Sequence, residues 1–477
     1  MRKFTLLIAS LFITIGAMAQ TFVEPEVGKF YKIKGDHETN HWVAVTTAGS
    51  SVVMSSSEES AAVFYKTENG FQEVTTKNYL GYTGGKFTFS STSLAVELRN
   101  TGACANSDGK YAIVSGGNYM YNNSADGIAH ESNAWLDLPR LWGFIEVDYD
   151  SFNNKVFALE SYMDYLYCLT DGTTNIYTNG SYSGTADTRA LWKPVLVSLG
   201  VYKIQNVHTG LYIGATNHAN SAQMSETPGS YEIATTVGSE TVEDGKYYIK
   251  VNGQNACLHS TAATAKGWEG GGLGNQYIFT EITEFSHTLN VTDAEWATIV
   301  LGFNATIPTA DGFKAYKIAS EEDGYVTLEE VTGVLQANVP VLVNAPVGNY
   351  NFAYTTDEAT VTESGLQGTL YNKDITVAGA YVLGLIDGEA GFGLATTTGK
   401  AEGTFTNNAN KAYFVPTNTL ASAASYSFRF GEGTTGVDQI TDNREQSTVI
   451  FDLTGRRVEA ITAPGIYVVG GRKVLVK

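Results

Sequence analysis

Residues that could perform chemistry are present, but we assign no catalytic signature to them. The chain contains no Gly-x-Ser-x-Gly nucleophile motif and no phosphate-binding loop. The run Gly270–Gly274 is rich in glycine, but neither a helical pattern nor a lysine follows it, so we interpret it as a long turn. The 49 aspartates and glutamates are spread along the whole chain, so no pair can be assigned to acid–base catalysis. We therefore expect a protein that is not an enzyme.

Histidines and cysteines are the remaining candidates for metal or redox chemistry. His37 and His41 flank a turn and could together ligate a metal. Because spacing alone rarely creates a site, we interpret this segment as a solvated loop and expect neither a metal nor a cofactor. The three cysteines, Cys104, Cys168 and Cys257, show no metal-ligand spacing. Cys168 and Cys257 occupy equivalent places in a repeat and are expected to be small buried hydrophobes, with a bridge between them as the alternative.

A repeated unit of short strands would position these residues. A strand phrase that opens on or near glycine, such as Gly28-Lys29-Phe30-Tyr31, begins at residues 28, 70, 109, 154, 200 and 245, in steps of 42, 39, 45, 46 and 45. A second, mostly aromatic strand follows in each unit, and most units close on an apolar strand. A period in this range indicates repeated supersecondary units. Binding residues are then expected in loops and shallow pockets between repeats.

Six units of about four short strands divide into two groups of three. This arrangement resembles a pair of ricin-type β-trefoil domains, over residues 20–148 and 149–283. Leu141-Trp142 and Leu191-Trp192 keep the tryptophan of that family's Gln-x-Trp box, whereas its glutamine is replaced by arginine and alanine. Other repeats offer a tyrosine at this place, namely Tyr65, Tyr231 or Tyr277. The aromatic closure predicts that Tyr31, Trp142, Trp192 and Tyr247 lie in the two cores.

The resemblance implies carbohydrate binding at the turn after the second strand of a repeat. A sugar needs an aromatic ring for its apolar face and polar groups for its hydroxyls. Three clusters supply them: Asp171, Asn175 and Tyr177 in the fourth repeat; Asn123, Asp126, His130 and Trp135 in the third; His259 and Trp268 in the last. The fourth repeat is preferred because its three residues lie within seven positions, although Asp171 is displaced by about two from the family's carboxylate. The alternative for each cluster is turn polarity beside a buried aromatic.

The rest of the chain has a different pattern. Residues 284–430 contain seven or more short strands separated by turn residues, which predicts a β-sandwich-like accessory domain, interpreted as a spacer. Residues 431–436 form a glycine-threonine linker. Residues 437–477 contain Asp452-Leu453-Thr454-Gly455-Arg456, Gly465-Ile466-Tyr467 and a terminal Lys-Val-Leu-Val-Lys. These three landmarks resemble the C-terminal sorting domain of type IX secretion substrates. The resemblance implies a secretion machinery as partner.

The N-terminus and the net charge indicate the compartment. Residues 1–19 combine Arg2 and Lys3, a short apolar run and Ala17-Met18-Ala19, which predicts a cleaved signal peptide and not a membrane span. We therefore expect a secreted or cell-surface protein. The net charge of −19 argues against nucleic acid as a partner, because such binding needs basic patches.

The sequence therefore predicts an all-β chain: two tandem β-trefoil-like domains, a β-sandwich-like domain and a small C-terminal β sorting domain. The function that fits is non-catalytic binding of glycans or glycoproteins. A structural or adhesive surface protein that binds other proteins is the first alternative. A glycan-processing hydrolase is the least favoured, because no segment is long enough for a catalytic barrel.

Overall fold

The computed structural model describes residues 21–35, 42–46, 51–100, 109–123, 127–131, 141–169, 174–178, 187–217, 220–322, 324–377, 379–386, 388–395, 404–417, 423–430, 450–452, 457–458, 465–469 and 472–476. Apart from short 3₁₀ turns, the regular structure of these residues is entirely β-strand, as predicted. Within this part of the chain, no helix is long and apolar enough to cross a membrane. Two compact units are formed, and the second begins at Glu284.

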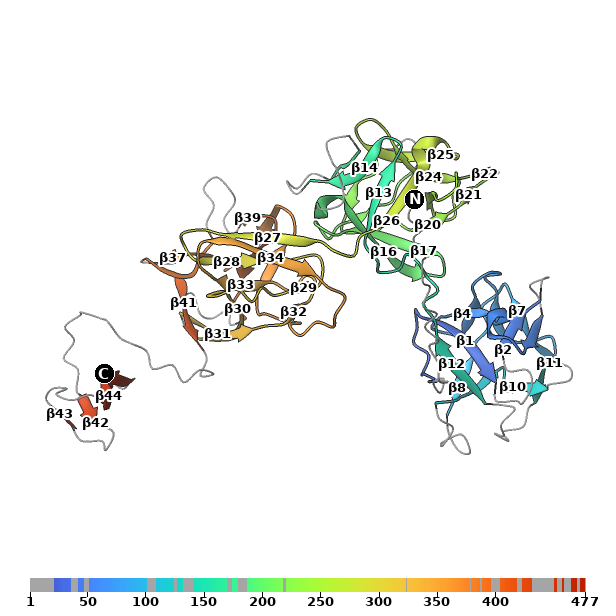
Figure 1. Cartoon of the computed structure of the whole chain (residues 1–477), viewed down its shortest axis with the longest axis horizontal. Coiled ribbons are helices and arrows are strands. Elements are labelled where there is room, and N and C mark those ends of the chain that lie inside the picture. Colours follow the sequence, from blue (N-terminus) through green and yellow to red (C-terminus); the bar gives the residue numbers. More distant parts are fainter. Residues whose placement is uncertain are drawn as a thin grey trace, which may run out of the picture. The chain divides into compact units, whose positions relative to one another are not determined.

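The second half of the first unit is a closed six-stranded barrel with three hairpins (Figure 1). Its strands are β13 (Phe157–Ser161), β14 (Asp164–Cys168), β15 (Ile176–Thr178), β16 (Leu191–Ser198), β17 (Val201–Asn206), β18 (Tyr212–Ile213), β19 (Met224–Ser225), β20 (Tyr231–Ala234), β23 (Tyr247–Val251), β24 (Ala256–Ser260), β25 (Ala265–Glu269) and β26 (Gln276–Glu281). Antiparallel pairs run from β13 through β16, β17, β20, β23 and β26 back to β13. The hairpins β14–β15, β18–β19 and β24–β25 branch off this ring. This is the β-trefoil arrangement of three four-stranded repeats; an added hairpin, β21 (Thr236–Val237) with β22 (Glu240–Thr241), precedes the last repeat.

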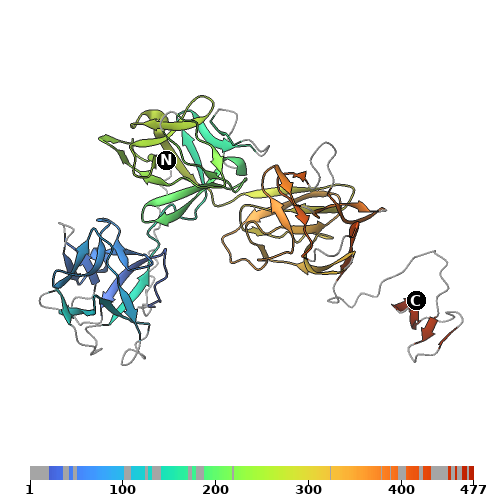
Figure 2. The same cartoon turned by 180° about the vertical axis from the view of Figure 1, so that it is seen from behind.

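The first half of this unit repeats the plan. Its strands are β1 (Phe30–Gly35), β2 (Trp42–Val45), β3 (Val52–Ser55), β4 (Val63–Lys66), β5 (Phe71–Glu73), β6 (Tyr79–Thr83), β7 (Lys86–Ser90), β8 (Glu97–Arg99), β9 (Ala112–Ser115), β10 (Asn118–Asn123), β11 (Gly127–Glu131) and β12 (Trp142–Glu146). β1 pairs with β12 and β4, and β4 pairs with β5. A bond from Val96 N to Asn69 O links the segments at β8 and β5, and a Tyr111–Trp142 bridge completes the ring. Figure 2 shows this barrel in blue to teal from behind.

The start of each repeat explains the recurring glycine. Gly28, Gly109, Gly200 and Gly245 have φ angles of 90°, 77°, 73° and 76°, and Asn154 has 59° at the corresponding place. Glycine adopts this left-handed backbone without steric cost, and asparagine tolerates it better than most residues. Gly70 has a different role, because an added Cβ would lie 2.8 Å from the carbonyl oxygen of Leu94.

The closing aromatic residues fill the barrel interiors. Trp142 and Trp192 are fully buried, and their indole N–H groups donate to the carbonyls of Met120 and Leu166 at 3.0 and 2.9 Å. Tyr231 and Tyr277 take the same place in the next two repeats and are also fully buried. The predicted core residues Tyr31, Trp142 and Trp192 are therefore confirmed.

Two predictions about the cores were wrong. Tyr247 is half-buried and packs at the barrel end against Phe152 and Phe279, and its neighbour Tyr248 is fully buried in a separate cluster with Val237 and Cys257. In the first repeat Phe64 fills the interior, and Tyr65 belongs to a separate small cluster with Phe30. Neighbouring strand residues point to opposite faces, so an error of one position exchanges inside and outside.

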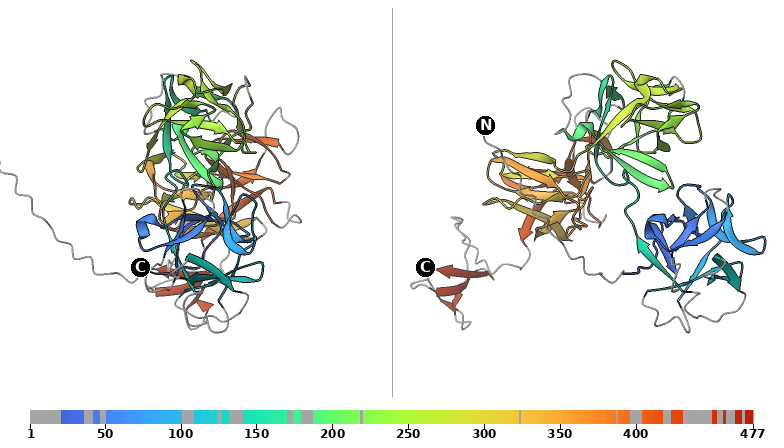
Figure 3. Two further views of the ribbon diagram at one scale, coloured as in Figure 1. Left: turned by 90° about the vertical axis from the view of Figure 1, so that its right-hand side faces the viewer. Right: turned by 45° about the vertical axis from the view of Figure 1, so that its right-hand side comes forward.

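The second unit contains a smaller and a larger β-sheet, and the larger sheet curls around a core of its own. The smaller sheet has the order β27 (Ser286–Val291), β34 (Gly348–Tyr354), β29 (Ala305–Thr306) and β32 (Val334–Leu335). The larger has the order β28 (Trp296–Ile299), β33 (Val341–Asn344), β30 (Lys314–Glu322), β31 (Tyr325–Val331), β41 (Ser425–Phe430), β38 (Glu389–Leu394), β37 (Tyr381–Ile386), β40 (Lys411–Phe414) and β35 (Gln367–Thr369). A further pair is β36 (Lys373–Thr376) with β39 (Thr404–Asn407). Figure 3 shows this unit in yellow to orange.

Strand β33 of the larger sheet is buried on both of its faces. Val341, Leu342 and Val343 in β33 are all fully buried, which is expected where a strand is covered on both sides. Leu342 belongs to the core inside the curled sheet, with Tyr316 and Phe392. The predicted sandwich-like domain therefore has one sheet that curls around a second core.

Four final strands form a separate sheet in the order β43 (Arg457–Val458), β42 (Ile450–Asp452), β44 (Gly465–Val469) and β45 (Arg472–Val476). They include two of the three C-terminal landmarks, at β44 and β45. The predicted signal peptide (1–19) and linker (431–436) lie outside the described residues.

Candidate functional site

The three hairpins of the second barrel meet around a pseudo-three-fold axis. Single bridges join them in a cycle: Asn175 with Gln223, Ser221 with Lys266, and Thr264 with Tyr177. Each hairpin contributes two residues, two positions apart in the chain, to two different bridges. These pairs are Asn175 and Tyr177, Ser221 and Gln223, and Thr264 and Lys266. Tyr177, Gln223 and Lys266 are therefore equivalent positions in the three repeats. The sequence placed Asn175 and Tyr177 in a loop, whereas the structure places their backbone in these contacts between hairpins.

The outer face of the last hairpin carries an exposed aromatic cluster. Trp268 on β25 is 39% exposed, and the Lys266 ammonium lies 4.2 Å from the centre of its ring. His259 on β24 lies opposite Lys266 in the strand register, and its ring centre is 5.7 Å from that of Trp268. Since residues two apart in a strand share a face, the three side chains project from one side of the hairpin. The structure thus brings together both predicted residues of this cluster and adds Lys266.

The glycine run after β25 holds this cluster in place. His259 Nδ1 is hydrogen-bonded to Asn275 Oδ1, and Asn275 Nδ2 donates to the carbonyl of Gly270 at 2.6 Å. A Cβ on Gly274 would lie 2.5 Å from His259 Cε1, so glycine makes room for the imidazole. The run includes a 3₁₀ turn, Leu273–Asn275, before the closing strand. This agrees with its interpretation as a turn and gives it a role in fixing His259.

The fourth repeat presents a different arrangement. Tyr177 stacks on Tyr167 with ring centres 5.4 Å apart and planes 24° apart. The exposed Asn175 donates from Nδ2 to the Tyr177 hydroxyl at 3.4 Å. Tyr167 is almost fully buried, so part of the Tyr177 ring is occupied by packing. Asp171 lies outside the described residues.

The third repeat is described only through its strands. Asn123 ends β10 and pairs with Gly127, and His130 on β11 pairs with Met120. Asp126 and Trp135 lie outside the described residues.

The two described cysteines are free thiols. Cys168 and Cys257 are fully buried, and burial raises the pKa of each thiol to about 12. This confirms small buried hydrophobes and excludes the bridge between them. Cys104 lies outside the described residues.

The prediction that Cys168 and Cys257 are equivalent was wrong. Phe157 pairs with Trp192 in one repeat, and Tyr247 pairs with Tyr277 in another, so Phe157 and Tyr247 are equivalent positions. Glu160 and Lys250 follow them by three residues each and are therefore equivalent too. Glu160 pairs with Tyr165, and Lys250 pairs with Cys257. Cys257 therefore takes the place of Tyr165.

His37 and His41 also lie outside the described residues. Their segment reads His-Glu-x-x-His, a zinc-binding pattern that requires both histidines on one face of a helix. The flanking strands β1 and β2 pair with each other at Lys34 and Trp42, so the segment connects two antiparallel strands. Among the described residues, no group of three or more His, Cys, Asp or Glu side chains could hold a metal ion.

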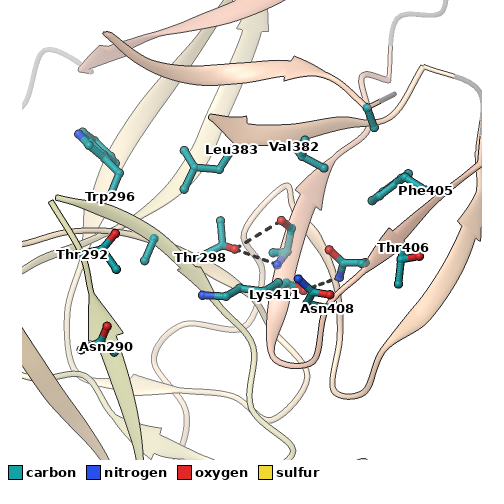
Figure 4. A pocket seen from close by; sticks show the side chains of 14 residues that line it. Asn290, Thr292, Trp296, Thr298, Val382, Leu383, Phe405, Thr406, Asn408 and Lys411 are labelled. Atoms are coloured by element: carbon teal, nitrogen blue, oxygen red, sulfur yellow. Dashed lines mark hydrogen bonds between the residues drawn. The ribbon is translucent and has the colours of Figure 1, made fainter. Parts of the chain in front are cut away.

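Sequence reasoning missed a cavity of about 430 Å³ in the second unit. It lies between β28 and β40 and includes Trp296, Thr298 and Lys411 in its lining (Figure 4). In the sequence analysis the segment from Asn410 to Phe414 was only part of the accessory domain that was interpreted as a spacer. No local signal could have linked it to Trp296, which is more than a hundred residues away in the chain.

Comparison with known proteins gives no family. No family model and no curated protein matches the chain. Among solved structures, a designed three-fold symmetric protein, ThreeFoil, is 17% identical with a TM-score of 0.22, over 27% of this chain and 99% of that one. A Polyporus squamosus lectin bound to a human-type influenza-binding epitope is 15% identical with a TM-score of 0.23, over 28% of this chain and 51% of the lectin.

An endo-β-galactosidase from Clostridium perfringens that releases GlcNAcα1-4Gal is 12% identical with a TM-score of 0.25, over 54% of this chain and 73% of the enzyme. At these TM-scores the likenesses support no conclusion about function. The fold described above rests on the strand pairing.

Proposed function

We propose that this chain is a secreted or cell-surface glycan-binding protein without catalytic activity, and that the last hairpin of the second barrel holds the ligand. The observation that carries the proposal is the exposed ring of Trp268 between Lys266 and His259. It is the one exposed tryptophan in the part of the chain that the structure describes. The Lys266 ammonium lies over part of this ring, and the remaining exposed part of the indole offers a flat apolar surface at low entropic cost.

The neighbouring groups supply the polar half of sugar recognition. Lys266 carries three N–H donors, and Nε2 of His259 is left as a second polar atom because Nδ1 is engaged by Asn275. The apolar face of a sugar ring would lie on Trp268, with hydroxyl groups directed at these side chains. One such site is shallow, so binding is expected at roughly millimolar to tens of micromolar Kd and would be strengthened by several sites acting together.

The barrel architecture supports a surface site. The interior of the second barrel is filled by Trp192, Tyr231 and Tyr277, all fully buried. Close packing of these rings leaves binding to the hairpins and loops. The first alternative, a structural or adhesive protein that binds other proteins, would use the same exposed hairpin face.

The secretory assignment rests on sequence patterns. Residues 1–19 have the pattern of a signal peptide, and residues 437–477 resemble a type IX sorting domain. The partners proposed on this basis are glycans or glycoproteins outside the cell and a secretion machinery during export.

A glycan array of the purified protein, followed by titration of the best hits, tests the binding proposal. Trp268→Ala should abolish binding without lowering Tm, because the ring is exposed. Tyr162→Ala is the matched control, since Tyr162 is 55% exposed on the β13–β14 turn and should bind like wild type. Loss of binding in Tyr177→Ala with retention in Trp268→Ala would place the site in the fourth repeat. Absence of any glycan ligand would favour the structural alternative.

A further inference from the structure

The cavity of the second unit lies where the larger sheet closes on itself. The two strands that approach each other there, β28 and β40, are not joined by a continuous backbone ladder. A backbone bond joins the residues that flank them, from Val300 N to Asn410 O at 3.3 Å, and the Thr298 side chain bridges to Ala412. Beside this incomplete seam the lining residues form a pocket of about 430 Å³ that is open to solvent on one side, and this volume is within the usual range for small-ligand pockets.

The lining combines three kinds of side chain. Trp296, Leu383 and Phe405 contribute apolar surface, as Figure 4 shows. Amide and hydroxyl groups are numerous: Asn290, Thr292, Thr298, Thr406, Asn407 and Asn408. Such a dense set of short polar groups beside an aromatic ring suits a ligand with many hydroxyls and one apolar face.

Lys411 is the charged side chain of the lining, which contains no aspartate or glutamate among its described residues. Burial lowers the pKa of Lys411, and burial followed by the charge of Lys411 lowers the pKa of His287. A partly buried ammonium is costly unless an anion or hydrogen-bond acceptors compensate for its lost hydration. In a chain of net charge −19, this cavity is therefore a local site for a negative group.

The cavity wall is rigid around Lys411. Asn410 has a φ of 58° and donates from Nδ2 to the carbonyl of Val300 at 2.9 Å. Asn407 donates from Nδ2 to the carbonyl of Lys411 at 2.8 Å. These bonds fix the backbone that carries the ammonium, so the site is largely formed before a ligand arrives.

We propose that this cavity binds one carboxylated sugar residue, a hexuronic acid. The carboxylate pairs with Lys411, and the hydroxyls bond to the side chains of Thr292 and Asn408. An apolar part of the sugar ring contacts the exposed part of Trp296, which also packs against Tyr316 and Phe428. The site is independent of the Trp268 cluster, because it is built from other residues in the other unit.

Titration of the full chain with D-glucuronate, D-galacturonate and D-glucose, followed by ligand-observed NMR, tests this proposal. We expect at least one uronate to bind about tenfold more tightly than glucose, since an ionic contact adds to the same hydroxyl contacts. Lys411→Met should weaken uronate binding about tenfold, and Lys411→Arg should retain most of it. Lys317→Met is the matched control, because Lys317 pairs with Glu329 on β30 and β31 and should not affect binding.

Three results would overturn the proposal: equal affinity for glucose and the uronates, unchanged uronate affinity in Lys411→Met, or no uronate binding up to about 50 mM. If Lys411→Met fails to fold, Asn408→Ala serves instead, because Asn408 is exposed and lines the cavity. The Asn408→Ala variant should bind the uronates and glucose more weakly by the same factor. Unchanged affinity of this variant for the uronates would count against the site. These outcomes are separate from those for Trp268→Ala, so either proposal can fail alone.

Discussion

Thr298 and Ala412 are 114 residues apart in the chain and are joined by a reciprocal pair of hydrogen bonds. Thr298 Oγ1 accepts from the backbone N–H of Ala412 at 2.9 Å and donates to the carbonyl of Ala412 at 3.4 Å. A side chain thus takes the place of a backbone rung between β28 and β40. The sheet closes around its core here without a complete ladder, and this leaves the space of the cavity beside it.

Replacing Thr298 with valine should destabilise the second unit by about 1–3 kcal/mol, because the isosteric side chain leaves the N–H and C=O of Ala412 buried without these partners. Thr298 is itself buried, so water cannot easily replace the lost bonds. Urea unfolding measures the change in the free energy of unfolding. Thr298→Ser keeps the hydroxyl and should recover most of the stability; equal losses in the two variants would show that the methyl group, not the hydroxyl, matters.

Trp192→Ala should destabilise the second barrel by roughly 3–5 kcal/mol, as truncation of a buried aromatic does. Trp192→Phe keeps the ring packing but loses the bond from Nε1 to the carbonyl of Leu166, and should cost about 1–3 kcal/mol. Thermal unfolding of the two variants separates packing from hydrogen bonding. A change of less than about 1 kcal/mol in Trp192→Ala would contradict its central place in the core.

The stability of the second unit should fall in mild acid because of His287. Its pKa is lowered from 6.5 by burial and by Lys411, so the folded state binds the proton less tightly than the unfolded state. The stabilisation is complete above the unfolded pKa and is lost as pH falls through the lowered folded pKa. His287→Gln cannot gain this proton, so its free energy of unfolding should decrease less between pH 7.5 and pH 5 than that of wild type. Parallel pH profiles would refute the assignment to His287.

Deletion of residues 437–477 should leave a folded protein that stays in the periplasm. The described strands of this segment pair only with one another, so no strand pair elsewhere in the described residues is broken. The three landmarks that resemble a sorting domain motivate the second half of the prediction. Tm of the truncated protein and fractionation of cells that express it are the measurements. Undiminished surface display would show that the segment is not needed for export.

Local backbone requirements made the repeats readable from the sequence. The positions of Gly28, Gly109, Gly200 and Gly245 need a left-handed φ, and this requirement acts on one residue at a time. The closing residues Trp142 and Trp192 each follow a leucine near the end of a repeat, and this local pattern predicted their burial. The period and the all-β class follow from such signals, and the trefoil plan was inferred from the resemblance to ricin-type domains.

The direction in which each side chain points could be predicted less well from the sequence. Tyr65 and Tyr247 were predicted inside, but Phe64 occupies the interior of the first repeat, and Tyr247 is only half-buried at the end of the second barrel. Runs of adjacent aromatic residues look alike in sequence, and only the strand register decides which ones point inward. The same register shows that Cys257 matches Tyr165 and not Cys168.

The sequence by itself determined the repeated strand units and the change of pattern near residue 284, because these depend on neighbours within a few positions. Tertiary structure alone decided that Trp268 is exposed beside Lys266 and His259, and that residues of β28 and β40, including Lys411, line one pocket. Both depend on strand register and sheet closure, which bring together residues that no local pattern connects.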